Sequence, residues 1–161
     1  MKGKCRTSRV VFLSIVMLVT SLSAASESPV RGAQLNSVSA CPEHSRQRTP
    51  EEVLDDHVAA FVSGDAALVA CDYARDAVLI QPGSVAYGKQ QIQATFASFF
   101  DIAGGNIVVS DHSLTFGESA ALFEYSVDSD HVVVSDGVDT FVIRHGLIEV
   151  HTAHLGGLSV K

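Results

Sequence analysis

Asp139 is a carboxyl group among apolar neighbours, in a part of the sequence that favours strands. Val138 precedes it and Phe141 follows two residues later. If this strand faces the interior, desolvation would raise the pKa of the carboxyl, and Asp139 could donate a proton or a hydrogen bond. An Asp139 that faces solvent, accepts hydrogen bonds or pairs with a histidine is the alternative.

His57 falls on the apolar face of an expected helix, among Val53, Leu54, Val58 and Phe61. An imidazole titrates near neutral pH, so a histidine in this place could donate a hydrogen bond or act as acid or base. A histidine that is satisfied within the core fits the same pattern.

His151 and His154 both lie in the last expected strand. Residues three apart on a strand point to opposite faces, so only one of the two can readily face the interior. A strand histidine without a function is the alternative for both.

Several other catalytic patterns are missing from the sequence. It has no His-Glu-x-x-His or Cys-x-x-Cys pattern, no Gly-x-Ser-x-Gly elbow and no glycine-rich nucleotide loop. Glu149 and His151 offer only two metal ligands on one face of a strand, which is fewer than zinc sites use. We therefore expect neither a metal nor a cofactor.

The first 25 residues differ in composition from the rest. An apolar run at 10–19 is followed by small residues at 23–25 and preceded by the basic residues Lys2, Lys4, Arg6 and Arg9. This pattern predicts a signal peptide, residues 1–25, that is cleaved near Ala25, and hence a secreted or periplasmic protein. An uncleaved anchor is the alternative, but a bilayer span needs about 20 apolar residues and this run is shorter.

Removal of that peptide makes the chain strongly acidic. Seven of the 11 Lys and Arg residues stay against 18 Asp and Glu, a formal charge of −11. Such a surface repels phosphate backbones and anionic lipids. We therefore expect no nucleic-acid partner and no membrane contact beyond the signal peptide.

Cys41 and Cys71 form an even pair after the signal peptide is removed, in a compartment that permits disulfides. Cys71 on a helix could equally be a small buried hydrophobe. The sequence leaves the pairing open.

The rest of the chain is expected as one domain. Residues 26–48 are polar and predict a flexible linker, residues 49–157 the domain, and residues 158–161 a short tail. The domain should contain helices at about 50–63, 65–73 and 89–103, and strands at 77–80, 106–116, 120–128, 132–144 and 147–155. Consecutive strands with short turns pair antiparallel, and helices must cover one face of the sheet, which gives an α+β fold.

Five segments, in this order and spacing, resemble a known family. They are Phe61–Asp65, Tyr73–Val78, Tyr87-Gly88, Asp136–Phe141 and Arg144–Ile148. The chain is similar over residues 50–156 to the nuclear transport factor two-like superfamily, in its SnoaL-like and ketosteroid-isomerase-like branch. The resemblance implies a cone-shaped fold of three N-terminal helices packed in a strongly curved, mostly antiparallel mixed sheet that encloses a pocket.

The resemblance also implies roles for individual residues. His57 matches the position of an oxyanion-hole tyrosine in ketosteroid isomerases, and Asp139 that of their protonated second oxyanion donor. Gln81 stands where those enzymes carry an aspartate base, and an amide cannot take up the proton. Steroid isomerisation of the usual kind is therefore not expected. In the aligned last strand, His151 faces the pocket and His154 the outer face.

We therefore expect an exported domain that binds a small, largely apolar molecule bearing a carbonyl or hydroxyl group. If it is an enzyme, the chemistry is cofactor-free isomerisation, cyclisation or dehydration, in which His57 and Asp139 polarise the oxygen and His151 moves the proton. Gln81 could orient the ligand, and the candidate aromatic walls are Tyr73, Tyr87, Phe96, Phe100 and Tyr125. The alternative is a non-catalytic binding or assembly module, with a homodimer formed through the outer sheet face.

Overall fold

The computed structural model describes Cys41 and residues 48–161, so the predicted signal peptide and most of the predicted linker lie outside the described residues. Its helices are α1 (Pro50–Val62), α2 (Ala66–Cys71) and α3 (Gly88–Ala103). Its strands are β1 (Tyr73–Gln81), β2 (Ser84–Tyr87), β3 (Val108–Phe116), β4 (Ala120–Asp128), β5 (Val132–Arg144), β6 (Leu147–Gly156) and β7 (Ser159–Val160). Among these residues no helix is long and apolar enough to cross a membrane.

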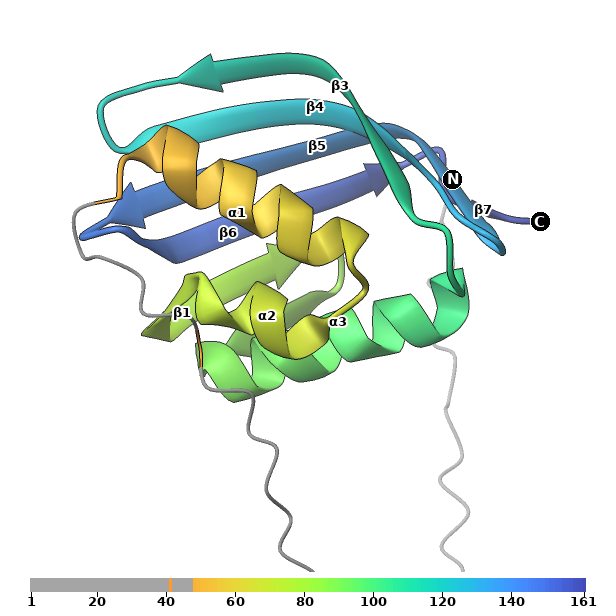
Figure 1. The fold of residues 1–161 in the computed structure, drawn as a ribbon, viewed down its shortest axis with the longest axis horizontal. Coiled ribbons are helices and arrows are strands. Elements are labelled where there is room, and N and C mark those ends of the chain that lie inside the picture. Colours follow the sequence, from red (N-terminus) through yellow and green to blue (C-terminus); the bar gives the residue numbers. More distant parts are fainter. Residues whose placement is uncertain (1–40, 42–47) are drawn as a thin grey trace, which may run out of the picture. The chain divides into compact units, whose positions relative to one another are not determined.

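The strands form one curled, unclosed sheet in the order β2-β1-β6-β5-β4-β3, with β7 beside β5. Among the strands that the structure describes, β1 and β6 alone pair parallel, and the other neighbours are antiparallel. Figure 1 shows the strands β3 to β6 curving over α1, with α2 and α3 next to it. The predicted α+β fold, with three helices and a curved, mostly antiparallel mixed sheet, is confirmed.

The first helix begins where the sequence predicts, because its free amide groups are capped. The Glu52 amide donates to the Thr49 hydroxyl at 3.3 Å, and the Thr49 amide donates to the Glu52 carboxylate at 2.8 Å. Such a capping box is worth about 1 kcal/mol. It fixes the start of the helix that carries His57.

Two strands are absent from the sequence-based prediction. Ser84–Tyr87 forms β2, which turns back on β1 through Pro82 and Gly83, and Gly83 has a φ of 81°. Proline followed by a glycine with positive φ is the signature of a type II turn. The two residues that the sequence predicts to end the strand therefore form the turn of a β-hairpin. Ser159–Val160, in the segment predicted as a tail, pairs with β5 as β7.

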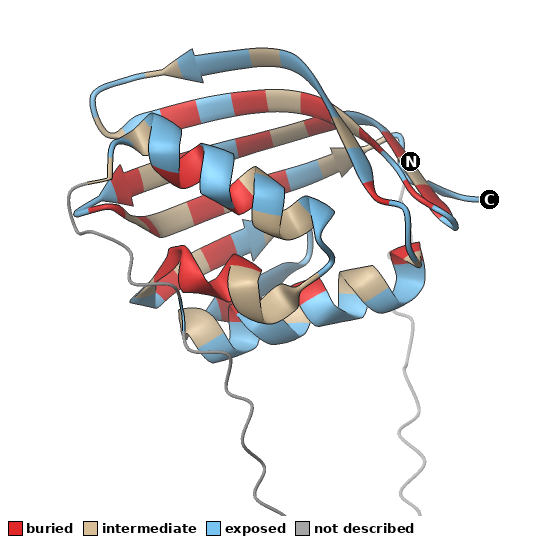
Figure 2. Cartoon of the chain, in the orientation of Figure 1, coloured by how far each residue is buried: buried red, intermediate tan, exposed pale blue. Residues whose placement is uncertain are grey.

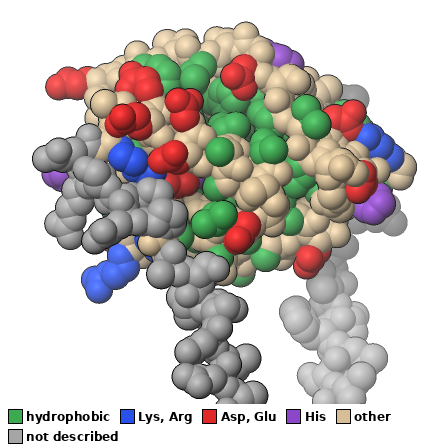
Figure 3. All heavy atoms as spheres, viewed as in Figure 1, with side chains coloured by type: hydrophobic (Ala, Val, Ile, Leu, Met, Phe, Trp, Pro, Cys, Tyr) green, Lys and Arg blue, Asp and Glu red, His purple; other side chains and the backbone are tan. Residues whose placement is uncertain are grey.

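Buried side chains cover the inner face of the sheet and the facing sides of the helices. On β5 they alternate with exposed or half-buried residues, as at Val132, Val134, Phe141 and Ile143 (Figure 2). On the surface, Figure 3 shows Asp and Glu side chains gathered over the start of α1, whereas hydrophobic side chains occupy the centre of the same face. The exposed acids of α1 are Glu51, Glu52, Asp55 and Asp56.

The segment that precedes α1 is fastened to the domain at two points. The Arg48 guanidinium donates to Asp56 at 2.7 Å, to Asp72 at 2.9 Å and to the carbonyl oxygen of Gly146 at 2.8 Å. Cys41 and Cys71 form a disulfide. Arg48, which the sequence places at the end of the linker, is therefore part of the folded domain.

Replacing both Cys41 and Cys71 by serine should lower the free energy of unfolding by about 3 kcal/mol. The disulfide joins residues 30 positions apart and so restricts the unfolded chain. Urea denaturation with and without dithiothreitol measures the effect. Reduction should cost the wild type a similar amount and leave the double variant unchanged, and a wild-type midpoint that does not move on reduction would contradict the prediction.

Candidate functional site

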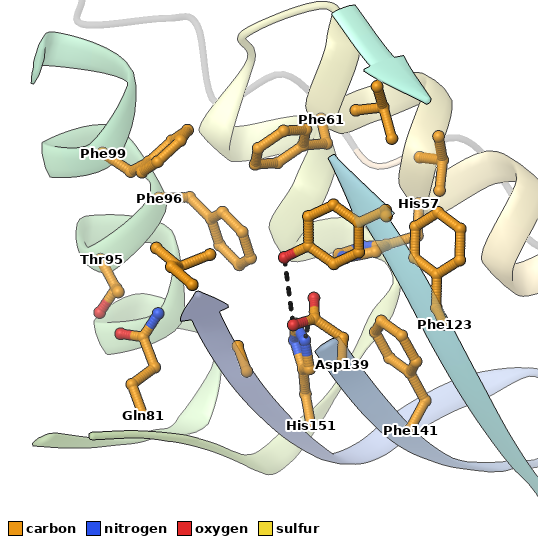
Figure 4. A pocket seen from close by; sticks show the side chains of 15 residues that line it. His57, Phe61, Gln81, Thr95, Phe96, Phe99, Phe123, Asp139, Phe141 and His151 are labelled. Atoms are coloured by element: carbon orange, nitrogen blue, oxygen red, sulfur yellow. Dashed lines mark hydrogen bonds and ion pairs between the residues drawn. The ribbon is translucent and has the colours of Figure 1, made fainter. Parts of the chain in front are cut away.

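A pocket of about 60 Å³ lies between α1, α3 and the inner face of the sheet. Figure 4 shows Asp139, His151 and Phe141 on the sheet side of this space, with His57 and Phe61 from α1 and Phe96 and Phe99 from α3 around it. The aromatic residues of its wall are Phe61, Phe96, Phe99, Phe123, Tyr125 and Phe141. The pocket is thus largely apolar, with a few polar groups set into one side, as is usual for small-molecule sites.

Asp139 and His151 form a buried hydrogen-bonded pair in this wall. The His151 Nε2 lies 3.0 Å from one carboxylate oxygen of Asp139, and the Tyr125 hydroxyl donates to the other at 3.1 Å. Behind the imidazole, the Tyr73 hydroxyl lies 2.6 Å from His151 Nδ1. The four side chains form one chain of hydrogen bonds, and their exposure is at most 8%.

The register of the sheet explains why these residues meet. Asp139 pairs with Ala153 and Phe141 with His151 across β5 and β6. Asp139 and His151 are therefore diagonal neighbours on the inner face, within reach of long side chains. Phe123 pairs with Asp139 across β4 and β5, which places Tyr125 diagonally on the other side.

Counting hydrogens along the chain assigns the protonation of the pair. The Tyr73 hydroxyl is fully buried, and the acceptor it reaches is His151 Nδ1. Nε2 then carries the imidazole proton and donates it to Asp139. His151 is thus neutral and Asp139 ionised, a state in which every proton along the chain has an acceptor.

The two tyrosines are held in the protonated form that this pattern needs. Burial, together with the negative charge of Asp139, raises the pKa of Tyr73 well above its usual value. The same two causes, and the hydrogen bond to Asp139, raise the pKa of Tyr125. Both hydroxyls therefore act as donors at ordinary pH.

His57 is enclosed by rings. It makes edge contacts with Tyr73, Phe96, Phe141 and His151, at centroid distances of 5.5 to 5.9 Å. Its Nδ1 lies 3.9 Å from the Asp72 carboxylate and makes no hydrogen bond to the described residues. Burial, and secondarily the neighbouring His151, lower the pKa of His57 to about 3. His57 is therefore a neutral wall of the pocket.

The structure brings most of the predicted site residues together. The residues that line the pocket as predicted are His57, Gln81, Phe96, Tyr125, Asp139 and His151. Gln81 lies at the end of β1, away from Asp139 in Figure 4.

Three of the predicted walls lie elsewhere. Tyr73 is behind His151 rather than on the pocket surface, and Phe100 packs against Phe61 and Phe96 in the core. Tyr87 is 63% exposed, so its prediction as a wall is wrong. It ends β2 and forms the N-cap of α3, a place where the side chain points to solvent.

The prediction of walls from sequence missed four aromatic residues, Phe61, Phe99, Phe123 and Phe141. Alternation along β4 and β5 could have identified Phe123 and Phe141. Residues two apart on a strand point to the same face, so Phe123 faces the same side as Tyr125, and Phe141 the same side as Asp139. His154 is exposed, as expected for the outer face, and Glu149 forms an ion pair with Arg144 at 2.8 Å. In residues 48–161 and Cys41, no three His, Cys, Asp or Glu side chains lie close enough together to hold a metal ion.

Comparisons with known proteins agree with this architecture. The family model of the SnoaL-like domain matches residues 54–151. An NTF-2 like protein of unknown function from Burkholderia xenovorans is 20% identical, with a TM-score of 0.56 over 66% of this chain and 81% of that one. No curated protein matches the chain.

Two further solved structures share the fold. SalBIII, an epoxide hydrolase/cyclase-like enzyme of pyran ring formation in the polyether salinomycin, is 15% identical, with a TM-score of 0.59 over 69% of this chain and 95% of that one. A protein with a ketosteroid isomerase-like fold from Catenulispora acidiphila, in complex with trimethylamine, is 16% identical. Its TM-score is 0.58 over 68% of this chain and 88% of that one.

The neutrality of His57 predicts acid sensitivity. Its folded pKa of about 3 lies below the unfolded value of 6.5, so the unfolded chain takes up a proton that the native state refuses. The stability that this difference provides is complete above pH 6.5 and is lost as the pH falls toward 3, by up to about 1.4 kcal/mol per pH unit. In His57→Phe, urea midpoints should fall less steeply over this range, whereas the exposed His154→Gln should follow the wild type. If the urea midpoint fell with pH equally steeply in all three proteins, the low pKa of His57 would be contradicted.

Proposed function

Because the chain belongs to the SnoaL-like domain family, we propose that this domain binds a small, largely apolar molecule bearing a carbonyl or hydroxyl group, and that Asp139 exchanges a proton with it. The observation that carries the proposal is the buried Asp139–His151 pair, which opens onto a pocket with otherwise mainly apolar walls. The carboxylate is the ionised member of this pair and can therefore accept a proton.

The hydrogen-bond chain assigns the roles. Both ring nitrogens of His151 are already engaged, by Asp139 and by Tyr73. Asp139 rather than His151 is therefore the group that takes a proton from the ligand, and His151 is a positioning residue that holds the carboxylate. Tyr73 fixes the tautomer of His151, as orienting groups do for imidazoles in other acid–base sites.

One neutral group is available to face the ligand's oxygen. His57 lines the pocket from α1, whereas Tyr125, which also lines it, gives its only proton to Asp139. Dipoles that are fixed before the reaction stabilise developing negative charge without reorganisation. Gln81 cannot take up a proton, but its amide can orient a polar group of the ligand.

Relatives and sequence features support this proposal. SalBIII acts in ring formation, and the Catenulispora protein was solved with a small molecule, trimethylamine. For the location of the protein, the basic and apolar pattern of residues 1–25 and the Cys41–Cys71 disulfide both favour export to an oxidising compartment.

Proton exchange from a simple ketone tests the proposal. The wild type should speed the exchange of the methyl ketone protons of 3,3-dimethylbutan-2-one for deuterium, followed by proton NMR, and Asp139→Asn should slow it at least about 100-fold. Asp136→Asn, which removes an exposed charge from the same strand, is the matched control. A ketone that binds without exchange would leave a binding module, and a ketone that neither binds nor exchanges would count against the pocket as a site.

A second, compatible function is assembly through the outer sheet face. One row across four strands joins Ile80, Thr152, Thr140 and Leu122 by register. Ile80 is 41% and Leu122 37% exposed, and the two threonine hydroxyls hydrogen-bond to each other between them. A flat row of apolar and self-satisfied polar groups suits a self-complementary interface, so we propose a homodimer on this face.

Charge placed in that row should separate the dimer. Leu122→Glu should shift sedimentation velocity profiles from dimer to monomer at micromolar concentration, because two like charges would meet across the symmetry axis. Ile102→Glu, at an exposed position of α3, is the control and should stay dimeric. A wild type that sediments as a monomer would exclude the interface.

A further inference from the structure

The ionisable groups around the pocket do not balance in charge. The described lining contains no Lys or Arg, and its groups that can carry a charge are His57, Asp139, His151 and Tyr125. Tyr125 keeps its proton, since burial and Asp139 raise its pKa. The charge of the pocket therefore depends on the two histidines and the carboxylate.

Neither histidine supplies a positive charge. His57 is neutral because burial holds its pKa at about 3. His151 is neutral because the Tyr73 hydroxyl, fully buried, donates to its Nδ1 and leaves Nε2 to donate to Asp139. With Asp139 ionised, the pocket carries one net negative charge.

Two cationic side chains of the domain, those of Arg48 and Lys89, are engaged by other groups. Arg48 is bound by Asp56 and Asp72, and the Lys89 ammonium lies 3.3 Å from the backbone oxygen of Cys71. Neither residue lines the pocket. A buried carboxylate held only by neutral donors is costly, and a bound cation would offset that cost.

The rest of the wall is suited to such a cation. Phenylalanine and tyrosine rings attract alkylammonium groups through their negative faces, and aromatic walls are a recurring means of binding them. The rings around this pocket are Phe61, Phe96, Phe99, Phe123, Tyr125 and Phe141. These rings accept the methyl groups of an ammonium as well as they accept a hydrocarbon.

On the basis of the function proposed above, we propose that the ligand is an organic cation, a small alkylammonium compound whose charged nitrogen lies against Asp139 and the surrounding rings. The hydroxyl or carbonyl group expected of the ligand would be a second feature of the same molecule. The acidic surface supports this class of ligand, because a chain with a formal charge of −7 draws small cations toward it.

Choline and 3,3-dimethylbutan-1-ol test the charge of the ligand directly. The two molecules have the same shape and the same hydroxyl, and differ in a quaternary nitrogen where the alcohol has a carbon. Titrations followed by amide chemical shifts of the wild type should give a dissociation constant for choline at least about tenfold lower than for the alcohol. The comparison needs no variant, so it does not depend on how any substitution folds.

The results of this titration distinguish failure of the cationic-ligand proposal from failure of the proposed function. Tighter binding of choline supports the cationic ligand, whereas equal or tighter binding of the alcohol overturns it and leaves the pocket as a site for neutral molecules. If neither compound binds and the ketone described above does not bind, the proposed function itself fails.

Substitutions identify the groups that recognise the charge. Asp139→Asn should weaken choline about tenfold or more and leave the alcohol within about threefold, since only the cation loses a charge partner. Asp136→Asn should change neither constant. Phe99→Leu, at a half-buried position of α3, should weaken choline more than the alcohol, and equal losses for both would show that the ring serves only as apolar wall.

Discussion

The hydrogen bond between His151 and Asp139 is the interaction on which the site depends. It joins β5 to β6 through side chains, and it fixes which group in the pocket is charged. Tyr73 and Tyr125 complete it from β1 and β4, so that four neighbouring strands each contribute one member. A network in which every proton has an acceptor specifies a single arrangement, because any rotation would leave a buried polar atom without a partner.

This network constrains the sheet as well as the chemistry. A slip of one residue between β5 and β6 would turn Asp139 to the outer face, next to the exposed rows that Thr140 and Thr152 now occupy. The inner positions next to the polar ones are filled by Phe123, Phe141 and Ala153, which line the same pocket as the carboxylate. The alternation of apolar residues that drives folding therefore also directs the Asp139 carboxylate into the pocket.

The sequence predicts the scaffold well and the site less completely. Helix caps and strand alternation are local signals, and they identify α1, β4 and β5. Local signals left open whether Asp139 faces the interior, and the choice of His151 over His154 came from the resemblance to the family. The pairing of Asp139 with His151 was only an alternative, because nothing local indicates which strands are neighbours. Tyr73 was expected as a wall, and its place behind His151 follows from the parallel pairing of β1 with β6, which joins residues far apart in the chain. Tyr87 was placed wrongly because the sequence did not reveal the short strand β2. A two-residue turn reverses the chain before this strand, which ends at Tyr87.

His57 stays neutral, through burial, although the Asp72 carboxylate lies beside it. An acid 3.9 Å from an imidazole would ordinarily favour the charged imidazolium. Here the Arg48 guanidinium, at 2.9 Å, is the closer partner of Asp72 and takes up much of its field. The same stretch of chain is joined to Cys41 through Cys71 and to β6 through the Asp72 carbonyl oxygen, which accepts from the Ile148 amide at 2.9 Å. The residues that fasten the segment before α1 thus also bind the carboxylate beside His57, so that Arg48 meets the charge of Asp72 while burial keeps the imidazole neutral.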